Sequence, residues 1–257
     1  MWDSAPFLKK FEPVLEYYPA EEKKTTATVV IFPGGGYWGR APHEGHSYAL
    51  HFNSIGMDAF VCEYRTSDMG DSFPSPLLDA RRAIRFVRAN AEKFGIDPDR
   101  VAVIGSSAGG HLAAFVSTYT DPIDGEGADE LDRINCVPNA TILCYPVIHY
   151  PDESGIAHAD SFYCLLGTEN ADFSKYSPDL LVTDETPTAF IWHTSEDPGV
   201  NVINSYRYAE ALRRHGIPHE MHIFPYGGHG AGLAEGKPHI AQWTGLMKNW
   251  LTEIGWL

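Results

Sequence analysis

Six short apolar runs alternate with segments of helical periodicity, and this alternation constrains the fold more than any other feature of the chain. The expected strands are residues 26–32, 57–64, 100–105, 139–145, 188–194 and 219–224. Several of them are continuously apolar, which is typical of a parallel sheet covered on both faces. The pattern therefore predicts an α/β fold: a doubly wound, mostly parallel sheet with helices on both faces.

The segments between these runs have the spacing of helices. We expect helices near residues 43–55, 75–95, 108–119, 201–215 and 239–254, and a short one around 158–166. Within 75–95 the arginines are interpreted as a solvated face rather than an anion site; they are Arg81, Arg82, Arg85 and Arg88.

The domain organisation follows from the same survey. No repeat or linker interrupts the chain, so residues 1–257 are expected to form a single domain. The long connection 146–187 is expected to form part of a pocket rim, because long loops in compact domains are often functional.

Composition narrows the expected partners and location. With 19 basic and 34 acidic residues the net charge is −15, so nucleic acid is an unfavourable partner. No apolar run reaches the length of a membrane span, and the first residues lack the pattern of a secretory signal. The cysteines include no C-x-x-C pair, and Cys62 and Cys144 lie in expected strands as free thiols. These features favour a cytoplasmic location.

A match to G-x-S-x-G lies between an expected buried strand and a helix of small residues. In VAVIGSSAGGHLAAF the match is Gly105 to Gly109, with Ser107 at its centre. Such a turn holds the serine above the sheet, next to the positive end of the new helix. Ser106 is the alternative, but it would need a glycine at 104, where the chain has Ile104.

A serine nucleophile needs a base, and the base needs an orienting carboxylate. Asp197 follows the expected strand 188–194, and His229 lies in a glycine-flanked loop after the strand 219–224. Glu196 is a rival for the acid, and His229 taken alone could be an ordinary loop histidine. The order of the three residues, each just past a strand, predicts a triad of Ser107, Asp197 and His229.

The stretch IFPGGGYWGR at 31–40 has two interpretations. Gly34, Gly36 and Gly39 fit the dinucleotide fingerprint G-x-G-x-x-G, with Glu63 near the place of a ribose-binding acid. That fingerprint must open a helix, whereas Pro42 would break its first turns. We therefore favour a loop that offers N–H groups to an oxyanion.

The expected oxyanion donors are backbone groups of that loop and of the serine turn. By position they are the N–H groups of Gly35, Gly36 and Ala108.

The run His43-Glu44-Gly45-His46 invites a metal interpretation. It is one residue short of H-E-x-x-H, and no Cys/His cluster supplies further zinc ligands. A surface or helix-start role is favoured, and no metal site is predicted.

With these motifs in place, the chain resembles an α/β-hydrolase esterase of the bacterial acetyl-esterase and acetyl-xylan-esterase-like group, near the hormone-sensitive-lipase-like esterases. The resemblance rests on PGGGYWG, the strand end Glu63-Tyr64-Arg65, the segment around GSSAGG, FIWHTSEDPGV and HIFPYGGHG. Two departures are Pro33, where a histidine commonly precedes the glycines, and Asn201, where a proline often follows the acid loop.

The resemblance implies a serine esterase that needs no cofactor and lacks a large cap domain. Its substrate would be a small-molecule or oligosaccharide ester, with short acyl groups, acetyl above all, on xylo-oligosaccharides. Expected aromatic contacts to the sugar are Tyr37, Trp38, Tyr64 and Tyr145. The alternatives are an amidase of the same fold (an arylformamidase or a peptidase) and a triad-bearing binding protein without turnover. The sequence leaves open whether the chain forms a homo-oligomer.

Overall fold

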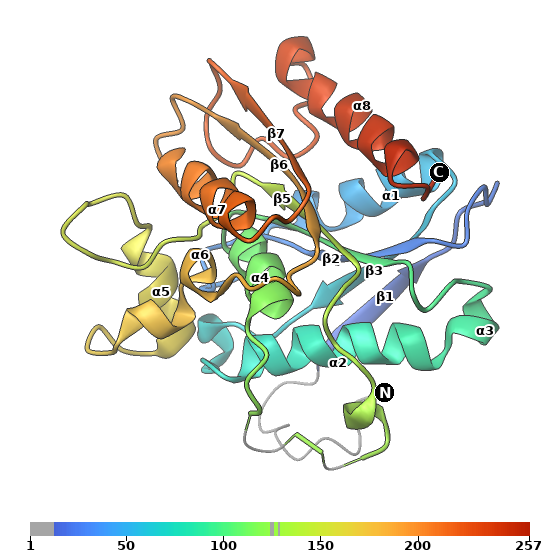
Figure 1. Ribbon diagram of the computed structural model, residues 1–257, viewed down its shortest axis with the longest axis horizontal. Helices are drawn as coiled ribbons and strands as arrows, with labels where there is room; N and C mark the ends of the chain where they lie inside the picture. The colour runs from blue at the N-terminus through green and yellow to red at the C-terminus, as the bar shows by residue number, and fades with distance from the viewer. Residues whose placement is uncertain (1–12, 124–125, 128) are drawn as a thin grey trace.

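The computed structural model describes residues 13–123, 126–127 and 129–257, and in this part of the chain seven strands form one sheet (Figure 1). The spatial order is β1-β3-β2-β4-β5-β6-β7. Strands β2 to β7 run parallel, and β1 pairs antiparallel with β3 at one edge. The strands are β1 (Val14–Tyr18), β2 (Thr28–Phe32), β3 (Asp58–Glu63), β4 (Val101–Ser106), β5 (Ala140–Cys144), β6 (Thr188–Thr194) and β7 (His219–Phe224).

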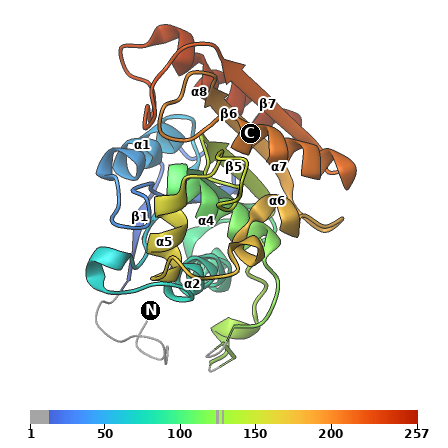
Figure 2. The same cartoon turned by 90° about the vertical axis from the view of Figure 1, so that its left-hand side faces the viewer.

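Helices cover both faces of this sheet, as Figures 1 and 2 show from two directions. The helices on one face are α2 (Ser75–Ala89), α4 (Ser107–Thr118) and α7 (Ile203–Arg214); those on the other are α1 (His46–Ser54) and α8 (Pro238–Glu253). The remaining α-helices are short: α3 (Ala91–Phe94), α5 (Ala159–Leu166) and α6 (Pro178–Leu181). Single turns of 3₁₀ helix are η1 (Pro42–Glu44), η2 (Ser67–Met69), η3 (Leu131–Arg133) and η4 (Phe173–Tyr176).

Alternate residues of the central strands pack into two separate hydrophobic cores. In β2, Val30 and Phe32 join the core under α2, α4 and α7, whereas Val29 and Ile31 join the core under α1 and α8. Because both faces are buried, the strand has no solvent-facing positions for polar residues. The predicted doubly wound α/β fold is confirmed, and each predicted strand lies within two residues of its observed bounds.

The connection between β5 and β6 contains α5, η4 and α6. Helix α5 coincides with the short helix predicted around 158–166. Ser161 of α5 lies close to the loop after β2, with its Oγ 4.0 Å from the position that a Cβ on Gly36 would take. This proximity places one part of the connection near the loop that follows β2, and the pocket rim over residues 146–187 stays a prediction.

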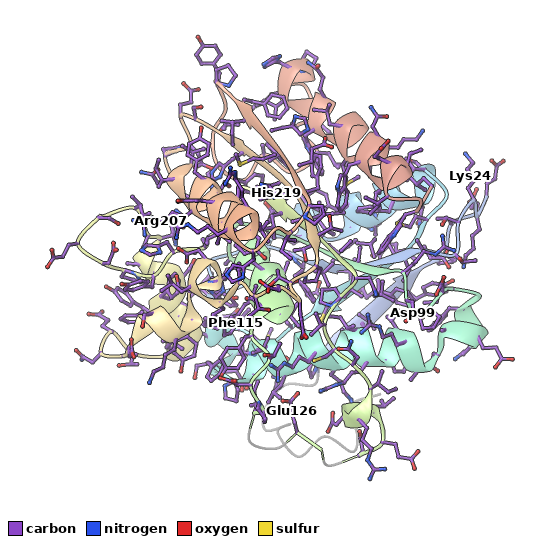
Figure 3. The ribbon with its side chains drawn as sticks, in the orientation of Figure 1. Lys24, Asp99, Phe115, Glu126, Arg207 and His219 are labelled. Atoms are coloured by element: carbon purple, nitrogen blue, oxygen red, sulfur yellow. The ribbon has the colours of Figure 1, made fainter. Side chains whose placement is uncertain are left out.

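Three of the four arginines of α2 are buried, so the prediction of a solvated face was wrong for these three. Arg81, Arg82 and Arg85 are 2%, 2% and 8% exposed. Their guanidinium groups pair with the loop that follows α4, where Glu126 (labelled in Figure 3) accepts from Arg81 at 2.5 Å and from Arg85 at 2.8 Å. In the same loop Asp129 accepts from Arg82 at 2.7 Å. The acidic loop folds over the helix and covers the arginines, so their charge marks a buried ion-pair network.

Among the described residues, none of the helices combines the length and the apolar character needed to cross a membrane.

Candidate active site

A sharp turn between β4 and α4 presents Ser107. Its φ is +54°, a left-handed conformation that is uncommon for a residue with a side chain. The flanking glycines leave no room for a Cβ: one on Gly105 would lie 2.0 Å from the carbonyl oxygen of Gly109, and one on Gly109 would lie 2.1 Å from that of Phe32. The sequence therefore places a strained serine at the first turn of α4, where helix N–H groups lack intrahelical partners.

The structure brings Ser107, His229 and Asp197 together from three separate loops. His229 Nε2 lies 2.7 Å from Ser107 Oγ, and His229 Nδ1 lies 2.8 Å from Asp197 Oδ2. Since the carboxylate can only accept, Nδ1 carries the proton and Nε2 accepts from the serine hydroxyl. This arrangement can remove the proton of Ser107 while the acid orients the imidazole.

Asp197 is held by four donors. Its Oδ1 accepts from the N–H groups of Gly199 at 2.8 Å and Val200 at 2.9 Å. Its Oδ2 accepts from His229 and also from His193 Nε2 at 3.2 Å. Burial alone would raise the pKa of Asp197, but the hydrogen bonds from His193 and His229 outweigh it and hold that pKa well below its usual range.

His193 is a part of the site that the sequence did not reveal. It is fully buried in β6, and its Nε2 faces two acceptors, Asp197 and the carbonyl oxygen of Val200 at 3.0 Å. Nε2 must therefore carry a proton, which leaves Nδ1 to accept from the hydroxyl of Ser205 at 2.8 Å. The only local signal was its position four residues before Asp197, at the end of an apolar strand.

The rival residues have other partners. Ser106 is buried, and its Oγ lies 2.9 Å from the hydroxyl of Tyr48. Glu196 accepts from the N–H of Gly227 at 3.0 Å, so it contacts the loop that carries His229 rather than the imidazole. The geometry therefore favours Ser107 and Asp197 over their neighbours.

The glycine loop after β2 lies directly beside Ser107. A Cβ on Gly34 would approach the Cβ of Ser107 to 3.2 Å. The next two glycines have positive φ, +132° at Gly35 and +66° at Gly36, and no hydrogen bond among the described residues uses their N–H groups. The loop does not open a helix as a dinucleotide fingerprint requires, because α1 begins only at His46. These N–H groups, with that of Ala108 in α4, are available to an oxyanion.

The structure corrects the predicted aromatic contacts at three of four positions. Tyr37, Tyr64 and Tyr145 are 1%, 0% and 2% exposed, so none presents a ring face to a sugar. Their hydroxyls bind inside the protein: Tyr37 to His111 Nδ1 at 2.8 Å and Tyr64 to the carbonyl oxygen of Pro33 at 2.6 Å. Trp38 is 68% exposed and remains a candidate.

The two histidines of the H-E-G-H run have separate partners. His43 Nε2 lies 3.2 Å from the carbonyl oxygen of Gly230, and His46 Nδ1 lies 3.2 Å from the hydroxyl of Tyr18. In the described part of the chain, no three His, Cys, Asp or Glu side chains are grouped so that they could hold a metal ion.

Two of the cavities among the described residues lie at opposite ends of the parallel strands. One of ≈ 330 Å³ adjoins His229 and has a polar lining that includes His43, Ser47, Glu235 and Lys237.

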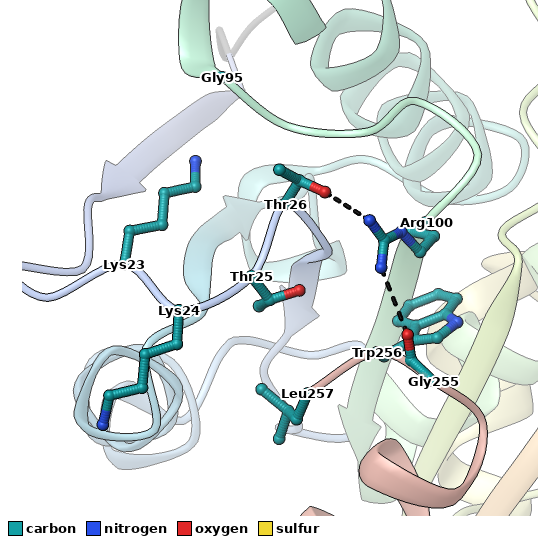
Figure 4. Close-up of a pocket in the computed structure, with 9 residues that line it drawn as sticks. All are labelled: Lys23, Lys24, Thr25, Thr26, Gly95, Arg100, Gly255, Trp256 and Leu257. Carbon is teal, nitrogen blue, oxygen red and sulfur yellow. Dashed lines mark hydrogen bonds between the residues drawn. The ribbon is translucent and has the colours of Figure 1, made fainter.

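The other cavity, of ≈ 550 Å³, lies where the parallel strands begin (Figure 4). There Arg100 donates to Thr26 Oγ1 at 2.6 Å and to the carbonyl oxygen of Gly255 at 3.3 Å. Of these two cavities, the smaller one is lined by His229 of the triad, so it is the candidate for a substrate group.

Comparison with known proteins shows which proteins the chain is similar to. The BD-FAE family matches residues 16–212. The chain is 38% identical to endo-1,4-beta-xylanase B of Butyrivibrio fibrisolvens, over 91% of this chain and 37% of that protein. It is 32% identical to an acetylxylan esterase of Xylanibacter ruminicola, over 91% of this chain and 47% of that protein. The chain thus spans less than half the length of these curated relatives.

A solved structure is similar over nearly its whole length. It is the acetyl ester-xyloside bifunctional hydrolase from Caldicellulosiruptor lactoaceticus, with a TM-score of 0.90 and 42% identity. The alignment covers 98% of this chain and 93% of that one.

Proposed function

The chain belongs to the BD-FAE family and to the acetyl-xylan-esterase-like group of α/β-hydrolase esterases, and on this premise we propose that it is a serine esterase with Ser107, His229 and Asp197 as its catalytic residues. The observation that carries the proposal is the pair of hydrogen bonds of 2.7 Å and 2.8 Å that join the three side chains.

The mechanism follows from the positions of these groups. Ser107 attacks the ester carbonyl while His229 Nε2 takes its proton, and Asp197 stabilises the imidazolium that forms. The N–H groups of Gly35, Gly36 and Ala108 stabilise the negative oxygen of the tetrahedral intermediate. The alcohol leaves with the proton from His229. Water then repeats the sequence on the acyl-enzyme and releases the acid.

We propose that the substrate carries a short acyl group, acetyl above all, on a xylo-oligosaccharide. The names of the relatives support this, because one is an acetylxylan esterase and another an acetyl ester-xyloside hydrolase. The polar cavity beside His229 supports a hydroxyl-rich alcohol, and exposed Trp38 can stack on a sugar ring.

A substrate panel tests both parts of the proposal. We expect kcat/KM to fall from acetyl to butyryl to octanoyl 4-nitrophenyl esters, and we expect acetate release from acetylated xylo-oligosaccharides. Ser107→Ala is expected to abolish both activities and labelling by a fluorophosphonate, whereas Ser106→Ala keeps them. Preference for octanoyl, or no acetate from any acetylated sugar, contradicts the substrate assignment. Labelling that survives Ser107→Ala contradicts the catalytic assignment.

A further inference from the structure

Glu44 is a buried acid at the centre of the H-E-G-H run, and the mechanism above gives it no role. It is 2% exposed and lies at the end of η1. Its Oε2 accepts from the N–H of Gly34 at 2.8 Å, and its Oε1 accepts from the hydroxyl of Tyr145 at 2.6 Å. One carboxyl group therefore joins the oxyanion loop to a residue at the end of β5.

Tyr145 extends this connection to the loop that carries the catalytic histidine. Its hydroxyl accepts from the N–H of Gly232 at 2.8 Å. Its ring meets the imidazole of His229 edge to face, with 5.1 Å between the ring centroids. Its backbone has a φ of +38°, a conformation that a bulky residue adopts only where its surroundings enforce it.

We propose that Glu44 is a positioning residue that fixes the oxyanion loop and the histidine loop relative to each other. The inference rests on the proposed triad and oxyanion donors. A carboxylate suits this role because its two oxygens accept from donors on opposite sides, here Gly34 and Tyr145. Binding the N–H of Gly34 inward fixes the first glycine of the loop, and the next two keep their N–H groups available to the oxyanion.

The position of Gly34 next to Ser107 explains why its hydrogen bond to Glu44 affects catalysis. A Cβ on Gly34 would lie 2.5 Å from Glu44 Oε2, 2.7 Å from the carbonyl oxygen of Ser106 and 3.2 Å from the Cβ of Ser107. Gly34 is thus held between the carboxyl group of Glu44 and the turn that carries Ser107. Without its acceptor, the loop can shift relative to Ser107 and its donors lose their preorganisation.

Glu44→Gln and Tyr145→Phe test the inference. Glutamine keeps the size of Glu44 but has a single acceptor oxygen, so either the N–H of Gly34 or the hydroxyl of Tyr145 faces an amide nitrogen in place of an acceptor. Loss of one oxyanion donor typically costs about 10²–10³ in kcat, and a loosened loop keeps its donors, so we expect kcat of Glu44→Gln to fall about 10- to 100-fold. Tyr145→Phe removes two hydrogen bonds, the one to Glu44 Oε1 and the one from the N–H of Gly232, but keeps the bond between Glu44 and Gly34. It therefore breaks the link to the histidine loop alone, and a loss of about 3- to 10-fold is expected.

The measurement is kcat and KM for 4-nitrophenyl acetate per active site, with sites titrated by fluorophosphonate. A purely structural role would lower the number of titrated sites and leave kcat per site unchanged. The positioning role lowers kcat per site and leaves KM within about twofold, since remote contacts to the substrate persist.

Tyr208→Phe is the matched control. It removes a buried hydroxyl that has no hydrogen-bond partner among the described residues, and wild-type kcat is expected. A wild-type kcat per site in Glu44→Gln overturns the inference, and so does a loss in Tyr208→Phe equal to that in Tyr145→Phe. Full activity in Ser107→Ala would instead overturn the proposed function.

Discussion

Replacing His193 by phenylalanine removes one of two side-chain donors to the triad acid. The imidazole of His193 donates to Asp197 Oδ2 at 3.2 Å, whereas His229 donates to the same oxygen at 2.8 Å. A hydrogen bond to a charged group contributes about 1.5–3 kcal/mol. The longer bond, whose donor also faces Val200, belongs at the lower end, about 1.5 kcal/mol. Since 1.36 kcal/mol corresponds to a factor of ten in rate, we expect kcat of His193→Phe to fall about tenfold.

Hydrolysis of 4-nitrophenyl acetate, with kcat expressed per fluorophosphonate-titrated site, measures this loss. His193→Gln is the matched control because its amide nitrogen can still donate to Asp197, and we expect kcat within about threefold of wild type. An unchanged kcat in His193→Phe would refute the reasoning. So would equal losses in the two variants, because the donor would then be irrelevant.

Three further predictions concern other parts of the molecule. Asp197→Asn is expected to lower kcat by about 10⁴, because the carboxylate that fixes the tautomer of His229 is lost. Glu196→Gln changes only the acceptor for the N–H of Gly227 and is expected to lower kcat less than about threefold. Equal losses of kcat in a steady-state assay would mean that Asp197 is not the triad acid. Burial lowers the pKa of His111 from 6.5 to about 4 in the folded protein, so the unfolded chain binds the proton first as pH falls. Protonation of the unfolded chain is therefore expected to lower the free energy of unfolding by about 2 kcal/mol between pH 7.5 and 5. Urea denaturation at both pH values measures this change, and a difference that persists undiminished in His111→Phe would contradict it. Trp38→Ala is expected to raise KM for acetylated xylo-oligosaccharides by up to about tenfold and to leave KM for 4-nitrophenyl acetate unchanged; equal changes in both would exclude a sugar-specific contact.

The sheet and its helices could be predicted because local sequence carries the signal. Strands buried on both faces have no polar positions, so Val101 to Ile104 form an apolar run whatever lies beside them. The exception is β1, an edge strand whose residues Val14–Tyr18 are mostly exposed. Its register depends on pairing with β3, which a local pattern does not encode.

The charges on α2 show where pattern reasoning fails. Arginine on a helix normally marks its solvent face, but Arg81 and Arg85 are buried by Glu126, which lies 45 and 41 residues away in sequence. Such a long-range pair leaves no periodicity to detect. The acidic composition of the loop around Glu126 was the one available signal.

The sharp turn around Ser107 was predictable for the same reason that the strands were, since its glycines and serine are contiguous. The hydrogen bonds around Glu44 were not. Glu44 and Tyr145 are 101 residues apart, and the sequence around each residue contains no motif that indicates the other. Tyr145 was therefore assigned to the substrate, when its hydroxyl is committed to Glu44 and Gly232.

The close contact between Gly109 and the end of β2 determines which parts of the molecule can vary without moving Ser107. A Cβ at Gly109 would lie 2.1 Å from the carbonyl oxygen of Phe32 and 2.6 Å from that of Pro33. The backbone of α4 at Gly109 therefore packs directly against the backbone at the end of β2. The distance from Ser107 to the glycine loop after β2 is then fixed by backbone atoms, which every amino acid shares. Side-chain substitutions in the connection between β5 and β6, or at Trp38, leave this backbone contact in place. They can therefore reshape the surroundings of Ser107 without changing its distance from the glycine loop.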